Sequence, residues 1–403
     1  MLAAGVLDEI DGCAKSLETE LIEFRRARHL RPELGRHEHH TTNAIIERLT
    51  NAGLKPRVLS SGTGVVCDVI GTAGDAPTMG FRGDIDALPL VDAKQVSYRS
   101  QVDGVCHACG HDVHTTIVLG TALVLAELAS RGLLTRSVRL IFQPAEEITP
   151  GGALDVIADG AIDGLEQVFA LHCDPKVEVG RVGLRIGPIT AGADHLQVTM
   201  SGPGGHTARP HLTADVVFAL GALITELPGV LSRTCDPRAG LSVVWGQVHS
   251  GAVANAIPRS GFVSGTIRCL DANVWEAAHA LIPDIIRSLA APYGVDVDID
   301  MHTSVPPCVN DAVCTRLLED AALATLGDDG VVRSDQSLGG EDFAWIAGRT
   351  PGSLARLGVR GRKVADIGDL HQATFDIDEE AIGVGVRLFS AVALDDSTHD
   401  GDH

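Results

Sequence analysis

The densest group of potentially reactive side chains lies in the segment CHACGHDVH, which runs from Cys106 to His114. Cys109 and His111 are separated by Gly110, whose backbone can bend so that both side chains point toward one place. A thiolate and an imidazole both bind transition metals, so this pair can form half of a metal site. A zinc ribbon built on Cys106 and Cys109 would need a second C-x-x-C, and the sequence contains none.

A second group of histidines, His37, His39 and His40, lacks the spacing of a zinc-protease motif. His37 and Glu38 would begin HExxH, but Thr41 stands where the second histidine is required. We therefore expect these three histidines to lie at the surface.

Two adjacent carboxylates follow the apolar stretch VRLIF, in the segment QPAEE that ends at Glu147. On irregular backbone, neighbouring side chains can point to different targets. One carboxylate can then bind a metal while the other takes a proton from water. The residue types alone leave open which of Glu146 and Glu147 plays which part.

Further candidate ligands follow two other β-rich stretches. His172 ends the stretch VFALH, and Asp84 and Asp86 follow TMGF in the segment FRGDIDALP. Open α/β sheets place their binding sites at the C-terminal ends of the strands. Three strands that each deliver such residues predict one common site, although none of these residues would indicate a site alone.

The elements predicted around these residues alternate between short strands and helices. We expect strands at 65–70, 78–81, 138–142 and 167–171, and helices at 17–30, 42–52, 115–129 and 152–159. This alternation predicts an α/β fold with a mostly parallel sheet flanked by helices.

A different pattern occupies residues 194–302. Strands are expected at 195–200, 241–248, 261–270 and 295–301, and helices at 215–227 and at 273–290, the second capped by Asn273. The order β-α-β-β-α-β is the ferredoxin-like pattern. Because its flanks are rich in glycine and proline, we predict a domain of residues 191–303 inserted into a larger domain of residues 1–190 and 304–403. The polar tail, 395–403, is expected to be disordered.

The composition excludes several classes of partner. The 403 residues include 53 acidic and 32 basic side chains, a formal net charge of −21. Such an acidic chain is unsuited to nucleic acid or to an anionic membrane. We expect no apolar run that spans a bilayer, no secretory signal and no disulfide scaffold, since the nine cysteines are scattered. A cytoplasmic protein with reduced thiols is therefore predicted.

The chain resembles the aminoacylase/carboxypeptidase family of metallopeptidases. Within that family it is most similar to the branch of hippurate hydrolases, N-acyl-amino-acid amidohydrolases and plant auxin-conjugate hydrolases. The resemblance rests on nine segments that occur in order, namely FRGDIDALPL, CHACGHDVHTT, LIFQPAEE, ALHCDP, GPGGHTARPH, NAIP, GTIR, GGEDF and LHQATFDIDE. It implies a metal-binding catalytic domain with an inserted domain that serves as lid and dimerisation surface.

The resemblance also implies roles for the matching residues of the larger domain. Five residues match metal ligands: Cys109, His111, Glu147, His172 and His371. Glu146 matches the general base, and Asp86 matches an aspartate that orients a metal-bound histidine. Asp112 and His114 match the motif without an assigned role, and Cys106 is expected to be a small core residue.

In the inserted domain, His206 resembles a histidine that polarises the scissile carbonyl, in its own subunit or in a neighbouring one. Asn255 and Arg268 resemble residues that hold the substrate's carboxylate or carbonyl end. An arginine suits this task because its guanidinium can bind a carboxylate with two parallel hydrogen bonds.

The predicted enzyme is a metal-dependent amidohydrolase that splits N-acyl or N-aroyl amino acids into a carboxylic acid and an amino acid. One or two divalent ions are implied. Thiolate and imidazole favour zinc, and the branch admits manganese, cobalt or nickel. A homodimer is expected through the inserted domain. The alternatives are a dipeptidase or carboxypeptidase of the same superfamily, and a catalytically inactive metal-binding protein, which would be expected to lose residues such as Glu146.

Overall fold

The computed structural model describes residues 4–361 and 368–395, and the chain divides into two compact units. The first unit comprises Met1–Gly187, Val309–Asp335 and Trp345–His403, and the second comprises Pro188–Cys308 and Gln336–Ala344. The inserted domain predicted at residues 191–303 lies within the second unit. Of the predicted disordered tail, all but Asp395 lies outside the described residues.

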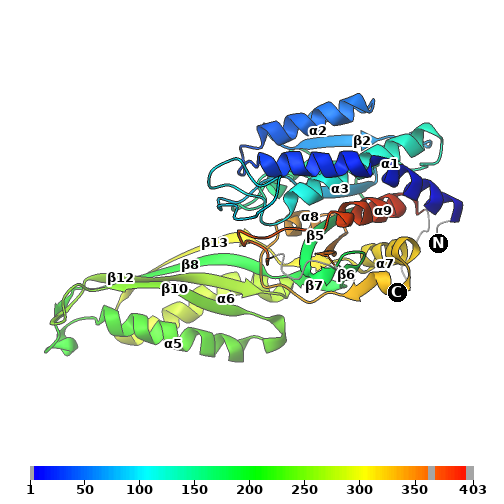
Figure 1. Ribbon diagram of the computed structural model, residues 1–403. Helices are drawn as coiled ribbons and strands as arrows, with labels where there is room; N and C mark the ends of the chain where they lie inside the picture. Colours follow the sequence, from blue (N-terminus) through cyan, green and yellow to red (C-terminus); the bar gives the residue numbers. More distant parts are fainter. Residues whose placement is uncertain (1–3, 362–367, 396–403) are drawn as a thin grey trace. The chain divides into compact units, whose positions relative to one another are not determined.

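An eight-stranded sheet forms the centre of the first unit (Figure 1). Its strands lie in the order β1 (Arg57–Val58), β2 (Val65–Val69), β4 (Val138–Gln143), β3 (Met79–Asp84), β5 (Gln167–Glu178), β16 (Gly352–Arg360), β6 (Val182–Leu184) and β15 (Val331–Arg333). The middle pairs, β4–β3, β3–β5 and β5–β16, are parallel, as is β6–β15. The pairs β1–β2, β2–β4 and β16–β6 are antiparallel. The predicted α/β class with a mostly parallel sheet is confirmed.

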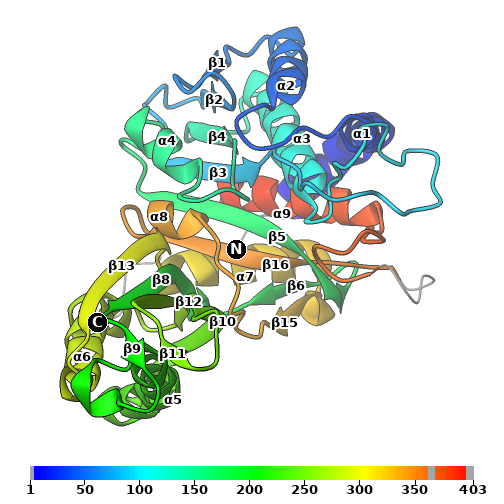
Figure 2. The ribbon, with the colours of Figure 1, turned by 90° about the vertical axis from the view of Figure 1, so that its left-hand side faces the viewer.

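Three long helices, α1 (Ala4–Leu30), α3 (His111–Ser130) and α9 (Glu380–Leu394), pack side by side in the first unit (Figure 2). Gly120 of α3 lies at the point where they meet, since a Cβ atom there would be 2.6 Å from Val386 and 2.8 Å from Leu21. A larger residue at position 120 would therefore force the helices apart. The other helices of this unit are α2 (His39–Asn51), α4 (Ala153–Ala158), α7 (Ala312–Leu326) and the short η4 (Asp328–Gly330), while α8 (Phe343–Ala347) crosses the boundary between the units.

The start of α3 differs from the prediction, which placed it at Thr115. The helix begins four residues earlier, at His111, because Gly110 adopts the left-handed conformation (φ 90°) that turns the loop into the helix. His111, Asp112 and His114 therefore belong to the first turns of a buried helix.

The second unit contains a four-stranded antiparallel sheet and two helices. The strands lie in the order β10 (Ser242–Ser250), β12 (Ser260–Cys269), β8 (Gly192–Ser201) and β13 (Asp296–Val305). With α5 (Val216–Thr234) and α6 (Ala272–Ala290), they follow the predicted β-α-β-β-α-β order, and the apolar sides of sheet and helices share one core. Smaller elements are β7 (Gly187–Thr190), β9 (Gly205–His206), β11 (Ala256–Ile257), β14 (Cys308–Asn310), η1 (Pro210–Leu212), η2 (Pro237–Ala239) and η3 (Ala291–Tyr293).

Two details of these helices correct the sequence analysis. The cap of α6 is Asp271, whose carboxylate accepts hydrogen bonds from the backbone N–H groups of Asn273 and Val274, so the assignment of Asn273 as cap was wrong. Helix α5 was predicted to end before Pro228 but continues to Thr234, because Leu227 and Leu231 extend its buried face past the proline. Asp215 caps α5, since its carboxylate accepts a hydrogen bond from the backbone N–H of Phe218.

In the part of the chain that the structure describes, two helices are long and apolar enough to cross a membrane, contrary to the expectation that no such run exists. In α3, 78% of the most apolar 18-residue stretch is buried inside the protein, as expected of a core helix. In α5 the corresponding share is 33%. Length and composition alone are weak grounds for a membrane span in either helix.

A buried arginine joins the first helix to two distant parts of the chain. Arg25 of α1 donates from Nε to Asp112 on α3 (2.7 Å) and from Nη2 to Asp376 (2.9 Å), and its Nη1 lies 3.4 Å from Glu379. Only 1% of the Arg25 and Asp112 side chains is exposed. The guanidinium also packs over the ring of Tyr98, 4.8 Å from the ring centre. This cluster connects the N-terminus, the start of α3 and the segment that precedes α9.

Replacing Arg25 with methionine should destabilise the protein strongly. The substitution leaves Asp112 as a buried charge without its guanidinium, which typically costs about 3–5 kcal/mol. Urea unfolding should show this loss. The matched control is Arg139→Gln, which breaks the partly exposed Arg139–Asp68 pair and should cost about 1 kcal/mol or less. Equal losses in the two variants would contradict the role given to Arg25.

Candidate metal centre

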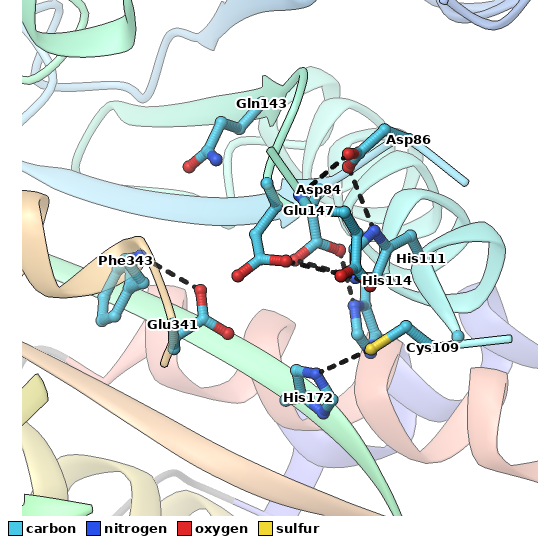
Figure 3. A network of polar contacts seen from close by, with 12 residues as sticks. Asp84, Asp86, Cys109, His111, His114, Gln143, Glu147, His172, Glu341 and Phe343 are labelled. Atoms are coloured by element: carbon cyan, nitrogen blue, oxygen red, sulfur yellow. Dashed lines mark hydrogen bonds and ion pairs between the residues drawn. The ribbon is translucent and has the colours of Figure 1, made fainter. Parts of the chain in front are cut away.

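The candidate ligands of the first unit come from the C-terminal ends of neighbouring strands and from the loop before α3. Asp84 ends β3 and Asp86 follows it, while Glu146 and Glu147 follow β4. His172 lies within β5, which continues to Glu178 and is longer than predicted. Figure 3 shows the side chains from these elements pointing toward one another.

The five residues predicted as metal ligands lie close together. Cys109 Sγ is 3.4 Å from His172 Nε2, and His111 Nε2 is 3.8 Å from Glu147 Oε1. His371 joins from the C-terminal part of the chain, with its Nε2 3.3 Å from Glu147 Oε1. The donor atoms of Cys109, His111 and His172 lie within 4.8 Å of one another, and so do those of Cys109, Glu147 and His371. The two groups share Cys109, and each of them could hold a divalent ion.

Glu146, predicted as the general base, lies beside this cluster. Its Oε2 is 3.9 Å from His111 Nε2, and the donor atoms of His111, Glu146 and Glu147 also lie within 4.8 Å of one another. Both glutamates are thus near the same imidazole.

Asp86 orients two members of the cluster at once. One carboxylate oxygen lies 3.1 Å from His111 Nδ1, and the other accepts the backbone N–H of Glu147 at 3.0 Å. A proton on Nδ1 leaves Nε2 of His111 free to face the cluster. In the same way, His172 Nδ1 lies 2.8 Å from the carbonyl oxygen of Cys173, so that its Nε2 faces Cys109.

The chemistry of the buried atoms fits a transition metal. His111 Nε2 is buried, yet it makes no hydrogen bond with any residue in the described part of the chain. Such an atom normally has a partner, and a divalent cation would provide one. Thiolate, imidazole and carboxylate together are donors typical of zinc and of its first-row neighbours.

Burial and neighbouring charges shift the pKa values of the candidate ligands. Burial raises the pKa of the Cys109 thiol well above its usual value, and burial lowers the pKa of His172. For His111, burial opposes the charged form, but Asp84 and the Cys109 sulfur raise its pKa overall. The hydrogen bond to Glu147 raises the pKa of His371. A metal must therefore displace protons from Cys109 and His111, and its affinity should rise with pH.

Two non-glycine residues with left-handed backbone flank the cluster. Ala145 has φ 55° and His371 has φ 61°. The N–H of Ala145 donates to the carboxylate of Glu38 at 2.7 Å, and the N–H of His371 donates to the carbonyl oxygen of Ala108 at 2.8 Å. Such conformations are uncommon for residues with side chains and persist where the surroundings fix them.

Glu38 is a residue of the site that the sequence analysis missed. It was considered only as part of a failed zinc-protease motif, yet it is buried, while His37, His39 and His40 around it are exposed as predicted. The sequence alone could not indicate Glu38, because nothing in it shows that this glutamate is buried while the histidines beside it are exposed.

The structure also explains the motif residues that had no assigned role. His114 accepts the backbone N–H of Cys173 at Nε2 (2.8 Å), and its Nδ1 lies 2.6 Å from Asp84 Oδ1, so both ring nitrogens are occupied. Asp112 binds Arg25 and His29. Cys106 is fully buried in the core, as expected.

The remaining predicted residues lie in the second unit. His206 is exposed on β9, and its Nδ1 accepts the N–H of Ala208 at 3.0 Å. Asn255 is exposed just before β11, which pairs with β9, so these two residues are neighbours. Arg268 lies apart from them, on β12, where its Nη1 donates to the carbonyl oxygen of Leu338 at 3.1 Å.

Comparisons with known proteins identify the family of the chain. Residues 80–395 match the model of peptidase family M20/M25/M40. An N-acetyl-L-cysteine deacetylase of Bacillus subtilis is 36% identical over 91% of this chain and 86% of its own length. A Rhodococcus jostii protein that carries the name of a glutamate–cysteine ligase is 45% identical over 93% of this chain, but the chain spans only 46% of that relative.

A solved structure gives the same result. The YXEP protein of Bacillus subtilis, described as a dinuclear metal-binding peptidase of family M20, superposes with a TM-score of 0.82 at 31% identity, covering 94% of this chain and 98% of its own. The family match spans most of the chain, and it contains the five candidate ligands together with Glu146 and Asp86. The chain belongs to peptidase family M20/M25/M40.

Proposed function

We propose that this protein is a metal-dependent amidohydrolase that cleaves the amide bond of N-acyl-amino acids. The observation that carries the proposal is the convergence of Cys109, His111, Glu147, His172 and His371, with Glu146 beside them. Five potential ligands and a further carboxylate are the parts that a hydrolytic metal site needs.

In this mechanism the two adjacent glutamates divide the work. Glu147 is held toward the ligands by its backbone bond to Asp86, and it serves as a ligand. A bound divalent metal would lower the pKa of a water and polarise the amide carbonyl. Glu146 accepts the proton of the attacking water and returns it to the leaving nitrogen, as a general base that becomes a general acid.

Three residues of the second unit complete the proposed reaction. His206 donates a hydrogen bond to the developing oxyanion, in its own subunit or across a dimer. Asn255 and Arg268 bind the substrate's carboxylate or carbonyl end. These assignments are supported by the family resemblance and, for His206 and Asn255, by the pairing of β9 with β11, which brings the two residues close together.

Cysteine is the amino acid that the relatives suggest first. One relative is named as a deacetylase of N-acetyl-L-cysteine, and another bears the name of a ligase that joins glutamate to cysteine. We extend this to the chain as a proposed N-acyl-cysteine substrate. Manganese or zinc as the metal, a homodimer through the inserted domain and a cytoplasmic location belong to the same proposal.

A substrate panel tests this function. The purified protein, loaded with zinc or with manganese, should release amino acid from N-acetyl-L-cysteine, N-acetyl-L-serine and N-benzoylglycine. N-acetyl-L-cysteine should give the highest kcat/KM. N-acetyl-L-serine is the matched control, because it differs only in having a hydroxyl group in place of the thiol. Turnover confined to dipeptides with a free amino group, such as alanyl-cysteine, would show a dipeptidase instead.

Neighbouring substitutions separate the two glutamates. Glu146→Gln should lower kcat by roughly 10²–10⁴-fold while the metal content stays at the wild-type level, because only the proton transfer is lost. Glu147→Gln should reduce the metal content itself, measured by elemental analysis after dialysis. Near-wild-type turnover by Glu146→Gln, or full metal retention by Glu147→Gln, would refute the division of roles.

A further inference from the structure

A buried arginine, Arg356, lies beside the proposed metal ligand His172. Arg356 of β16 is the register partner of His172 on β5, in a parallel pair. Directly opposed residues on neighbouring strands project to the same face of a sheet, so the Arg356 side chain lies on the face where His172 meets Cys109. Burial of Arg356 is nearly complete, since 9% of its surface is exposed.

Arg356 has no acidic partner in the described part of the chain. No hydrogen bond or ion pair joins its guanidinium to another described residue, whereas the other strongly buried arginines of this unit are paired. Arg25 binds Asp112 and Asp376, and Arg82 binds Asp84 at 2.7 Å and Gln143 at 2.9 Å. A buried charge without a partner is unfavourable for folding, so its presence needs another explanation.

The strand on the other side of β16 supplies no partner either. Arg356 faces Gly183 of β6 there, and a Cβ atom on Gly183 would lie 3.2 Å from Cβ of Arg356 and 3.3 Å from that of Ser334. The glycine leaves room beside the arginine and brings no charge.

We infer that Arg356 binds a carboxylate of the substrate next to the metal centre, in addition to the contacts made by the second unit. The inference rests on the proposed function, because an N-acyl-amino acid always carries an α-carboxylate. An acidic side chain or a dicarboxylic acyl group adds a second one. The guanidinium can form two parallel hydrogen bonds to a carboxylate, and the anion offsets the unpaired buried charge.

The test uses three single variants of the full-length enzyme. Arg356→Met keeps most of the side-chain volume and removes the charge. Arg356→Lys keeps the charge and removes the planar guanidinium that can form two parallel hydrogen bonds. Arg360→Met is the control, since Arg360 lies on the same strand but pairs at the surface with Glu178. The ligands are N-acetyl-L-alanine, its C-terminal amide, N-succinyl-L-alanine and N-acetyl-L-aspartate, which differ in the number and position of their carboxylates.

Arg356→Met should raise KM roughly tenfold to a hundredfold for the substrate whose carboxylate it binds, with a smaller change in kcat. Arg356→Lys should recover part of the loss, and Arg360→Met should match the wild type. Loss on N-acetyl-L-alanine assigns the α-carboxylate. Loss confined to the succinyl or aspartyl compound assigns the acyl group or the side chain. Because no protein partner is removed, the melting temperature of Arg356→Met should not fall.

Isothermal titration calorimetry with the Glu146→Gln variant, with and without Arg356→Met, measures the affinity for these compounds in the absence of turnover. If the wild type hydrolyses none of these compounds but Arg356→Met still weakens their binding, the proposed function fails and the arginine assignment stands. The inference is overturned if Arg356→Met affects the amide as much as the acids, affects none of them, or lowers the melting temperature with a uniform loss of activity. The inference is also overturned if none of the carboxylate compounds binds to the protein.

Discussion

The site depends first on the two oxygens of Asp86. One lies against His111 Nδ1 and the other accepts the N–H of Glu147, so a single buried carboxylate fixes the loop after β3, the start of α3 and the loop after β4 in one arrangement. The bond to Nδ1 directs Nε2 of His111 into the cluster, where it meets Glu147. Around this centre, Arg25 ties α1 to Asp112, the residue after His111, and to the segment that follows His371. Residues far apart in the sequence can converge because these buried polar contacts fix the ends of their elements.

Charge within the site differs from charge over the whole chain. A net charge of −21 would repel an anionic substrate, yet buried guanidinium groups lie close to the candidate ligands. Arg82 neutralises Asp84, whereas Arg356 has no acidic partner among the described residues and lies beside His172. Unpaired buried charge and left-handed backbone at Ala145 and His371 both cost stability. Such costs concentrate where they serve binding or catalysis, and here they surround one cluster of potential ligands.

Much of this arrangement could be predicted from the sequence, because the stretches 78–81, 138–142 and 167–171 are short apolar runs that are each followed by a polar residue. The family motifs then indicated five candidate ligands, and the structure brings their side chains close together. What failed depended on local detail: Gly110 starts α3 at His111 rather than at Thr115, and Asp271 caps α6 in place of Asn273. Glu38 and Arg356 were missed because their importance comes from contacts across the fold. Glu38 meets Ala145 more than a hundred residues away, and Arg356 meets His172 only through the register of β16 on β5.

The central claim is that Cys109, with the surrounding imidazoles and carboxylates, holds a divalent metal. X-ray absorption spectroscopy of the zinc-loaded protein tests it most directly. The method measures the distances from zinc to its ligand atoms, and sulfur lies farther from zinc than nitrogen or oxygen does. The wild type should show sulfur at about 2.3 Å together with nitrogen and oxygen at about 2.0–2.2 Å, and Cys109→Ser should lose the sulfur contribution. A zinc spectrum with only nitrogen and oxygen neighbours in the wild type, or one unchanged by Cys109→Ser, would contradict the claim.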